Sequence, residues 1–350
     1  ANTSSPQHKD SHRSLTRRSF GVLALGSFSA LALAACGSSN SSDSNASASS
    51  ASTSAKPAPS ALPSGMGSTA GDGEFPRTVK HFRGETKIES APKSVVILST
   101  GQLDDVLALG LVPIGAATAN DADLVPEYLK TKFSDKSAEL DKIAKVGKRT
   151  EPDLGAIANL HPDLILINNT NKKEEIYDSL SKIAPTVVTE GTGHNWKQDF
   201  LMVASALGSL SKAEEMLKEY EDKAKKLGEK AGKEKTFSFL YAAGDRTRVY
   251  AKSSFVGSIC EDASLARPAV QQEGKTSIDL SSENLDQADG DYLFYGVQGG
   301  DESKLTSETL WESLKAVKEK HAHKVDSDMF YLNAGITAAL GVIEEIDKNI

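Results

Sequence analysis

Cysteine is scarce in this sequence, which has two cysteines among its 350 residues. Cys36 closes an apolar run and Cys260 lies within the apolar stretch 255–260, so we expect no disulfide between them. We expect Cys260 to be a small buried residue rather than a reactive thiol. Nothing in the composition suggests a disulfide-rich scaffold.

Sequence motifs of catalysis are also missing. The chain has no Gly-x-Ser-x-Gly elbow, no phosphate-binding Gly-x-x-x-x-Gly-Lys run, no Rossmann glycine fingerprint and no His-Glu-x-x-His. His81, His161 and His194 are isolated and His321 and His323 lie in a basic segment, so we expect no metal site. An anchored enzyme stays an alternative, because an active site can be assembled from scattered residues.

Positive charge is in the minority, with 40 Lys and Arg against 48 Asp and Glu. The first 35 residues contain four of the basic residues and one of the acidic ones, so the remainder carries a formal net charge of −11. An acidic surface of this kind disfavours nucleic acid and anionic lipid as electrostatic partners.

The apolar run from Phe20 to Leu33 is too short to cross a bilayer. It follows Arg17-Arg18 and leads into Cys36, which predicts a signal peptide over residues 1–35. The stretch 33–36 resembles a bacterial lipobox and 16–20 a twin-arginine export signal, which implies cleavage before Cys36 and a lipid anchor on its sulfur. An uncleaved anchor is the alternative.

Residues 36–74 are rich in Ser, Ala, Pro and Gly and poor in large apolar side chains. Such a segment cannot bury enough apolar surface to offset the entropy of ordering. We therefore expect residues 36–74 to form a disordered, lipid-anchored linker.

From residue 75 onward, strand patterns alternate with helical patterns. The expected strands are 95–98, 112–115, 163–167, 186–189, 236–241, 248–251, 291–295 and 329–332, and the expected helices are 103–109, 153–160, 172–183, 254–263, 282–288, 311–319 and 334–346. This alternation predicts an α/β fold of two lobes with mainly parallel sheets flanked by helices, over residues 75–208 and 233–350.

Between the two blocks, apolar residues recur every three or four positions from Trp196 to Lys230, which predicts helix. Gly208 interrupts the pattern, and residues 211–214 read as a capping box that starts a second helix. We expect a single long helix within 209–232, about 28 Å from residue 212 to 230, to join the lobes with little closure of the cleft.

A weak internal repeat relates the two lobes. Residues 153–160 lead into a strand at 163–166 as residues 281–288 lead into a strand at 291–294. We expect each unit to be a helix, capped by Asp153 or Ser281, that feeds a buried strand. Chance similarity between two helix–strand units is the alternative.

Several motifs then point to a family. They are the stretches 76–81, 84–88, 91–96, 103–110 and 146–154, followed by Trp196, 206–208, 255–257 and 282–291. In their order and spacing they resemble the iron-siderophore binding lipoproteins of bacterial ABC importers, which are helical-backbone periplasmic binding proteins. The resemblance implies two α/β lobes joined by one long helix, little hinge motion and a ferric chelate in the cleft.

The resemblance also implies an acidic residue on each lobe that docks onto arginines of the membrane permease. Glu283 fits this role in the second lobe. The alternative is that Glu283 only stabilises the start of a helix, where negative charge is favourable. The matching position of the first lobe is Gly155. Either Glu151 or Asp153 substitutes for it, or docking relies on one lobe.

Ligands of open α/β sheets bind beyond the carboxyl ends of the strands. A bulky, often anionic chelate needs guanidinium donors and flat aromatic rings rather than metal ligands. Arg246, Arg248 and Tyr250 alternate along an expected strand, which puts them on one face. We expect Lys148, Arg149, Trp196 and Tyr241 to face them. The alternative is that the charged side chains are solvated and the aromatic side chains belong to the core.

We therefore expect a monomeric, lipid-anchored, extracytoplasmic solute-binding protein that captures a ferric siderophore and delivers it to an ABC permease. No catalytic residue and no resident cofactor or metal is expected. Haem or a cobalamin on the same scaffold is the alternative ligand, with His194 and Tyr241 or Tyr250 as axial ligands to haem. Hydroxamate, catecholate and carboxylate chelates all suit such a site.

Overall fold

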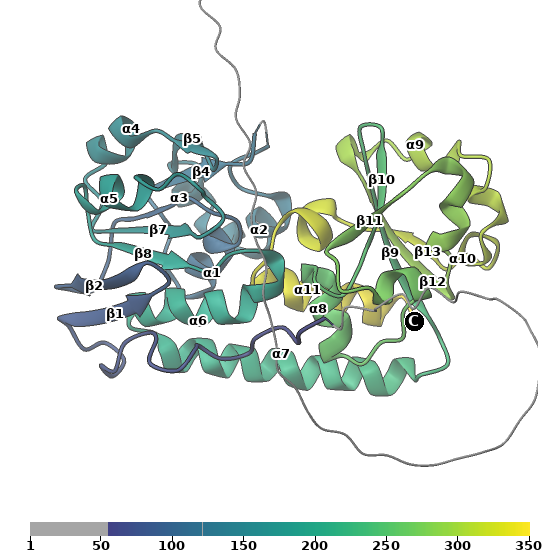
Figure 1. Cartoon of the computed structure of the whole chain (residues 1–350), viewed down its shortest axis with the longest axis horizontal. Helices are drawn as coiled ribbons and strands as arrows, with labels where there is room; N and C mark the ends of the chain where they lie inside the picture. Colours follow the sequence, from purple (N-terminus) through teal and green to yellow (C-terminus); the bar gives the residue numbers. More distant parts are fainter. Residues whose placement is uncertain (1–54, 121) are drawn as a thin grey trace, which may run out of the picture. The chain divides into compact units, whose positions relative to one another are not determined.

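The computed structural model describes residues 55–120 and 122–350. The expected signal peptide, Cys36 and the first part of the expected linker lie outside the described residues. These described residues form one compact unit, in which two separate large sheets make two lobes (Figure 1). No helix within the described ranges combines the length and the apolar character that a membrane span requires.

The first lobe is built on a six-stranded sheet in the order β6-β5-β4-β3-β7-β8. Its strands are β3 (Val95–Ile97), β4 (Gly115–Thr118), β5 (Ala144–Lys148), β6 (Glu151–Pro152), β7 (Leu164–Asn168) and β8 (Thr186–Thr189). All neighbours run parallel except β5 and β6. Every residue of β3, β7 and β8 is buried, as expected for strands covered on both faces.

The second lobe is built on a five-stranded sheet in the order β11-β10-β9-β12-β13. Its strands are β9 (Phe237–Ala243), β10 (Arg246–Tyr250), β11 (Ser277–Leu280), β12 (Tyr292–Val297) and β13 (Ala322–Lys324). Strands β9, β12 and β13 are parallel, whereas β10 runs antiparallel to β9, to which a tight hairpin joins it. Strand β11 pairs antiparallel with β10. The prediction of a two-lobed α/β fold is confirmed, with a mixed second sheet.

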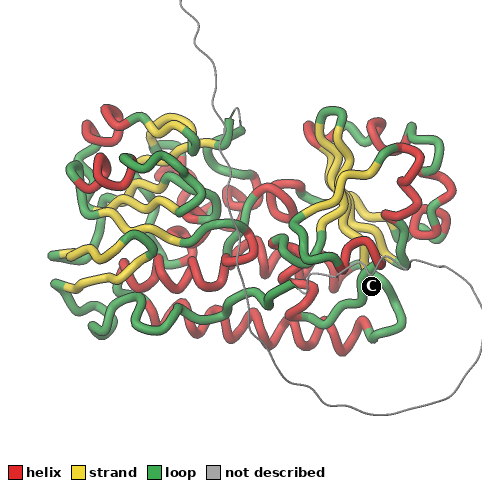
Figure 2. The backbone as a smooth tube through the Cα atoms, in the orientation of Figure 1, coloured by secondary structure: helices red, strands yellow, loops and turns green. Residues whose placement is uncertain are grey.

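Helices cover both sheets (Figure 2). The helical segments beside the first sheet are α1 (Gln102–Ala108), α2 (Glu127–Lys132), η1 (Ser134–Lys136), α3 (Ser137–Leu140), α4 (Leu154–Asn159), α5 (Ile176–Ser181), η2 (Gly193–Asn195) and α6 (Trp196–Leu207). After the joining helix follow α8 (Phe255–Asp262), η3 (Ala269–Gln272), η4 (Ser282–Ala288), η5 (Gln298–Gly300), α9 (Ser303–Thr306), η6 (Trp311–Ser313), α10 (Lys315–Lys318), η7 (Asp328–Leu332) and α11 (Ile336–Lys348).

A single long helix, α7 (Leu210–Ala231), runs along both lobes as predicted (Figure 1). Its start differs from the expected capping box. The main-chain N–H groups of Leu210 and Ser211 donate to the two carboxylate oxygens of Asp72, at 3.0 and 3.1 Å. Asp72 therefore caps the joining helix from a distant part of the chain, and Ser211 lies inside the helix. The domain boundaries 75–208, 209–232 and 233–350 stay predictions.

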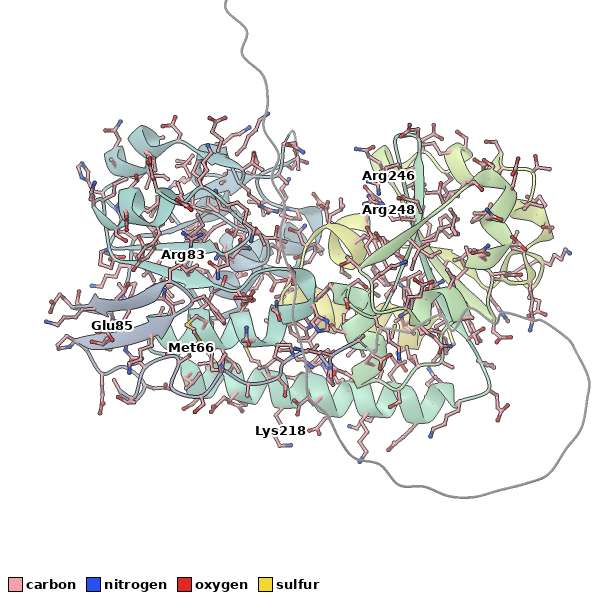
Figure 3. The ribbon with its side chains drawn as sticks, viewed as in Figure 1. Met66, Arg83, Glu85, Lys218, Arg246 and Arg248 are labelled. Carbon is pink, nitrogen blue, oxygen red and sulfur yellow. The ribbon has the colours of Figure 1, made fainter. Side chains whose placement is uncertain are left out.

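The segment just before residue 75 is not the free linker that its composition predicts. Gly67 pairs with Lys80 of the β1 (Arg77–His81) and β2 (Gly84–Ile88) hairpin, and the Ser68 N–H donates to Ser205 Oγ at 2.7 Å. Met66 packs against the core beside α6 (Figure 3). The prediction is wrong for residues 62–74, because main-chain hydrogen bonds and the packing of Leu62 and Met66 against the core hold this segment in place.

Four expected elements differ in the structure. Residues 112–114 precede β4 as loop, and the expected strand 329–332 belongs to the π-helix η7. The expected helix 311–319 is divided at Leu314, whose ψ of 137° is extended. The expected helix 282–288 is 3-10, and Ser281 makes no side-chain cap bond to it.

The internal repeat has a structural counterpart. The carboxylate of Asp163, before β7, accepts the N–H groups of Lys93 and Ser94, which lead into β3. The carboxylate of Asp291, before β12, accepts the Thr236 N–H that leads into β9, at 2.8 Å. In each lobe, an aspartate directly before one strand (β7 or β12) thus fixes the start of the neighbouring parallel strand (β3 or β9).

Candidate functional site

The β9–β10 hairpin of the second lobe positions an arginine against a tyrosine. Tyr241 and Arg248 are paired across the hairpin, so their side chains share a face. The Arg248 guanidinium lies 5.8 Å from the centroid of the Tyr241 ring, within the range of a cation–π contact. Figure 3 shows Arg246 and Arg248 on the side of this lobe that faces the first lobe.

Tyr331 completes an aromatic surface here, although the sequence analysis did not select it. Its ring stacks on Tyr241 at 5.6 Å and lies tilted against Tyr250 at 4.8 Å, both measured between ring centroids. Its hydroxyl donates to the main-chain oxygen of Phe294 at 2.6 Å, which fixes the ring. Tyr331 was missed because its segment was interpreted as a strand, whereas the π-helix η7 turns the ring toward the other two tyrosines.

Burial keeps the tyrosine hydroxyls protonated. The pKa of Tyr250 is raised by burial, and that of Tyr241 is raised first by burial and then by the charge of Tyr250. The positive charge of Arg248 opposes both shifts. At neutral pH the hydroxyls are therefore neutral, and the rings of Tyr241 and Tyr250, 2% and 7% exposed, are packed beside one cation.

The first lobe contributes Arg149, which directly follows β5. Its Nη1 donates to Thr100 Oγ1 at 2.9 Å, and its main-chain oxygen accepts from the Asn171 side chain at 3.4 Å. Thr100 follows β3 and Asn171 follows β7, so three strand ends meet at this arginine. Arg149 thus occupies the carboxyl edge of the first sheet.

Arg149 and the second lobe interact electrostatically. Burial lowers the pKa of Arg149, and the charges of Tyr128 and Asp328 oppose this. Burial is the largest cause that raises the pKa of Asp328. The negative charges of Asp326 and Asp123 raise this pKa further, and the positive charge of Arg149 lowers it. Asp328 begins the π-helix that holds Tyr331, so this carboxylate links the charges of the two lobes.

Unpaired hydrogen-bond donors distinguish this region. The Nε atoms of Arg149 and Arg248 are both buried without a hydrogen-bond partner among the described residues. A buried donor without an acceptor costs about 1–3 kcal/mol, more when it is charged. Two guanidinium groups from opposite lobes are therefore ready to donate to an oxygen-rich anion.

Three predicted residues lie elsewhere or are otherwise engaged. Trp196 is 2% exposed, donates through Nε1 to Ser258 Oγ at 3.1 Å and packs edge-on against Tyr220. Its expected role in the cleft is wrong, because the indole belongs to the core between the lobes. Lys148 is exposed on β5. Arg246 is also exposed, and its Nε and Nη2 atoms form a bidentate ion pair with the two carboxylate oxygens of Asp279, each at 3.0 Å.

Arg83 is a further cation that the sequence analysis missed. It sits at the tip of the β1–β2 hairpin, donates to Asn169 Oδ1 at 3.0 Å and lies next to the carboxyl ends of β7 and β8 (Figure 3). With Thr192 and Asn195 it lines a hollow of about 340 Å³. Arg83 could have been selected from the position of its hairpin next to the sheet edge. That position follows from the strand order, which only the structure reveals.

A bigger hollow of about 1180 Å³ lies on another face, between α2, α7 and α11. Its rim includes Lys230 and Asp347, which pair with each other at 3.2 Å. We place the site at the arginines and tyrosines instead, since they combine strand ends with unpaired buried donors.

Comparison with known proteins identifies the family of this chain. The family model described as periplasmic binding protein matches residues 95–329. The chain belongs to the periplasmic binding protein family. The predicted family is thereby confirmed.

Relatives of this periplasmic binding protein include two from Bacillus subtilis. The probable siderophore-binding lipoprotein YfiY is 34% identical over 77% of this chain and 86% of its own length. The petrobactin-binding protein YclQ is 30% identical over 78% of this chain and 88% of its own length. The crystal structure of Staphylococcus aureus SirA complexed with staphyloferrin B covers 78% of this chain and 97% of SirA, with 28% identity and a TM-score of 0.66.

The residues expected to dock onto a permease are unequally available in this periplasmic binding protein. Glu283 is exposed at the start of η4. In the first lobe, Asp153 caps α4 by accepting the Ala156 N–H at 2.9 Å, as predicted, so its carboxylate is engaged. Glu151 is exposed, lies 3.8 Å from the Lys173 ammonium and lines a hollow of about 580 Å³ with Leu154.

Proposed function

We propose that this periplasmic binding protein captures a ferric siderophore between its lobes and delivers it to an ABC permease. The observation that carries the proposal is the pair Arg149 and Arg248, one from each lobe, whose buried Nε donors have no hydrogen-bond partner in the described part of the chain. Tyr241, Tyr250 and Tyr331 add flat surface beside Arg248. This combination suits a bulky chelate with anionic oxygens at its rim.

The names of its relatives support the same ligand class. YfiY is named a probable siderophore-binding lipoprotein, YclQ binds petrobactin, and SirA was crystallised with staphyloferrin B. Arginine, rather than lysine, is the residue that matches planar oxygen pairs of such ligands. We therefore assign ligand contact to Arg149, Arg248, Tyr241, Tyr250 and Tyr331.

A lipid anchor and a permease complete the proposal. The lipobox-like sequence at Cys36 and the lipoprotein relatives support an anchored form on the outer face of the cell membrane. Glu283 would contact the permease from the second lobe, and Glu151 is the better candidate in the first lobe, because Asp153 is used as a helix cap. We propose that the protein acts as a monomer.

Haem or a cobalamin is less well supported as the ligand. The Tyr241 ring stacks on Tyr331, the Tyr250 ring lies tilted against Tyr331, and the Arg248 cation lies over Tyr241. His194 is half-buried in η2, and burial lowers its pKa, while hydrogen bonds with the main chain of Lys56 and Pro57 oppose this shift. A Soret band on addition of haem would favour the haem alternative over the siderophore.

Native mass spectrometry of the protein against a panel of ferric siderophores tests the proposal. We expect a one-to-one complex with at least one ferric chelate and none with the matching iron-free chelator, because the iron gathers the anionic oxygens into one rigid rim. Failure of every hydroxamate, catecholate and carboxylate chelate to bind would defeat the proposal.

A further inference from the structure

One carboxylate of the first lobe caps a helix of the second. The Oδ1 atom of Asp104, in α1, accepts the Thr337 N–H at 2.9 Å, and its Oδ2 atom accepts the Ala338 N–H at 3.0 Å. These N–H groups belong to the first turn of α11, whose own N-cap residue is Gly335. The helix therefore takes its capping side chain from the other lobe.

Two glycines permit this contact between the lobes. Gly335 has φ +141°, and a Cβ atom there would lie 2.5 Å from Asp104 Cγ. Gly101 has φ +86°, and a Cβ atom there would lie 3.0 Å from the main-chain oxygen of Ala334. Each lobe thus supplies a glycine where the other lobe's atoms come too close for a side chain.

A third donor holds the same carboxylate. The Tyr128 hydroxyl donates to Asp104 Oδ2 at 3.0 Å, and Asp104 is 1% exposed. Burial raises the pKa of Asp104 to about 6, while the N–H groups of Thr337 and Ala338 and the Tyr128 hydroxyl oppose the shift. Three donors converge on one buried acceptor group, so its position is strongly determined.

Both ends of this contact continue into the candidate site. On the first lobe, Thr100, the partner of Arg149, directly precedes Gly101 and lies four residues before Asp104. On the second lobe, Tyr331 lies four residues before Gly335. A shift at Asp104 therefore changes the position of Thr100 relative to Tyr331.

The lobes also meet at a second place. Lys197 of α6 pairs with Asp262 of α8 at 2.7 Å, and Trp196 bonds Ser258. Loss of the Asp104 contact would leave this second contact in place. The lobes could then turn about it without coming apart.

We propose that Asp104 is a positioning residue that sets the separation and orientation of the two faces of the ligand cleft. It touches no ligand itself, and this inference rests on the proposed function. With Asp104 in place, the cleft is preformed and Arg149 faces the second lobe at a fixed distance. A rigid chelate then binds without a large closure of the lobes.

The variant Asp104→Asn tests this role, with Asp105→Asn as its matched control. An asparagine amide has one acceptor oxygen, so either Thr337 or Ala338 loses the partner of its N–H. Asp105 is the adjacent buried acid of α1, but its Oδ1 has no partner among the described residues. Affinity is measured by calorimetry with the ferric chelate selected by mass spectrometry.

The separation of the lobes is measured in the same variants by electron–electron double resonance. Spin labels are placed at Lys182→Cys and Lys304→Cys, which are exposed positions on the first and second lobe. Cys36→Ser removes the labelling site at Cys36, and Cys260 is fully buried. This readout requires no ligand.

We expect Asp104→Asn to weaken binding about tenfold and to broaden and shift the distance distribution, since small misplacements of positioned groups are costly. Asp105→Asn should match the unsubstituted protein in both measurements. Unchanged affinity in Asp104→Asn, or a loss of affinity with an unchanged distance distribution, would overturn the proposal.

Two further results keep the test decisive. If Asp104→Asn does not fold, Tyr128→Phe removes a single hydrogen bond to the same carboxylate and should shift both readouts in the same direction by a smaller amount. No effect of Tyr128→Phe would then count against the proposal. If the unsubstituted protein binds no ferric chelate, the proposed function fails, while the distance measurement still decides whether Asp104 holds the lobes.

Discussion

The two lobes present different chemistry to the space between them. The first lobe offers Arg149 and Arg83 on loops, each tied by hydrogen bonds to other loop residues at strand ends. The second lobe offers Arg248 over a tyrosine and next to two further rings. Repeated α/β units thus share a sheet framework, while loop residues supply the charges of the first lobe and strand and π-helix residues supply the aromatic rings of the second.

The most direct way to break this comparison is to remove the central arginine of each lobe. Arg149→Ala and Arg248→Ala should each weaken binding of the ferric chelate by about 100-fold, as expected for two charge-assisted hydrogen bonds. Arg246→Ala is the control and should have little effect, since the exposed Arg246 is paired with Asp279. Calorimetry checks all three, and equal losses for Arg246 and Arg248 would contradict the site.

The framework itself can be compared through the repeated aspartates. Asp163→Ala and Asp291→Ala should each lower the free energy of unfolding by about 2 kcal/mol, because each leaves main-chain N–H groups at a strand start without an acceptor. Chemical denaturation measures both. A loss in one lobe only would show that the repeat is a similarity of pattern without a shared structural role.

The lobes also differ in their expected permease contacts. Glu283→Arg should reduce siderophore uptake in cells by about tenfold while affinity for the chelate is unchanged, since it reverses a charge at an interface. Glu151→Arg is the matched change in the first lobe and should cost less, because Glu151 already has Lys173 nearby. Equal uptake by the Glu283→Arg variant and the unsubstituted protein would remove Glu283 from the docking surface.

The smallest effect concerns buried acids of the first lobe. Burial raises the pKa of Asp199 to about 7 and that of Asp104 to about 6, and it raises that of Asp105 well above its usual range. These three carboxyl groups therefore bind more protons in the folded protein than in the unfolded chain between about pH 4 and pH 7. Their contribution to the free energy of unfolding should fall as the pH rises through this window.

Asp105→Asn tests this pH dependence. The variant should gain about 1 kcal/mol at pH 8 relative to the unsubstituted protein, because a neutral amide avoids the desolvation of a buried charge. The gain should shrink at pH 5, where Asp105 is protonated in the folded state. Denaturation curves at both pH values check this, and a gain independent of pH would contradict the assignment.

The sequence pattern was sufficient for most of the architecture and part of the site. Buried strands such as β8 and capped helices such as α4 carry their periodicity and caps locally. Arg248 and Tyr250 could be selected because alternation along one strand fixes their common face. Trp196 could not be assigned, since a tryptophan at a helix start suits a core and a cleft equally well.

What the sequence determined alone is therefore what depends on near neighbours: the two α/β lobes, the joining helix and the face of β10. Tertiary structure decided the contacts between distant residues. Asp72 caps α7, Asp104 caps α11 and Tyr331 stacks on Tyr241, each across more than 80 residues of chain. Such contacts leave no local pattern, because a main-chain N–H group or a ring face accepts its partner from anywhere in the chain.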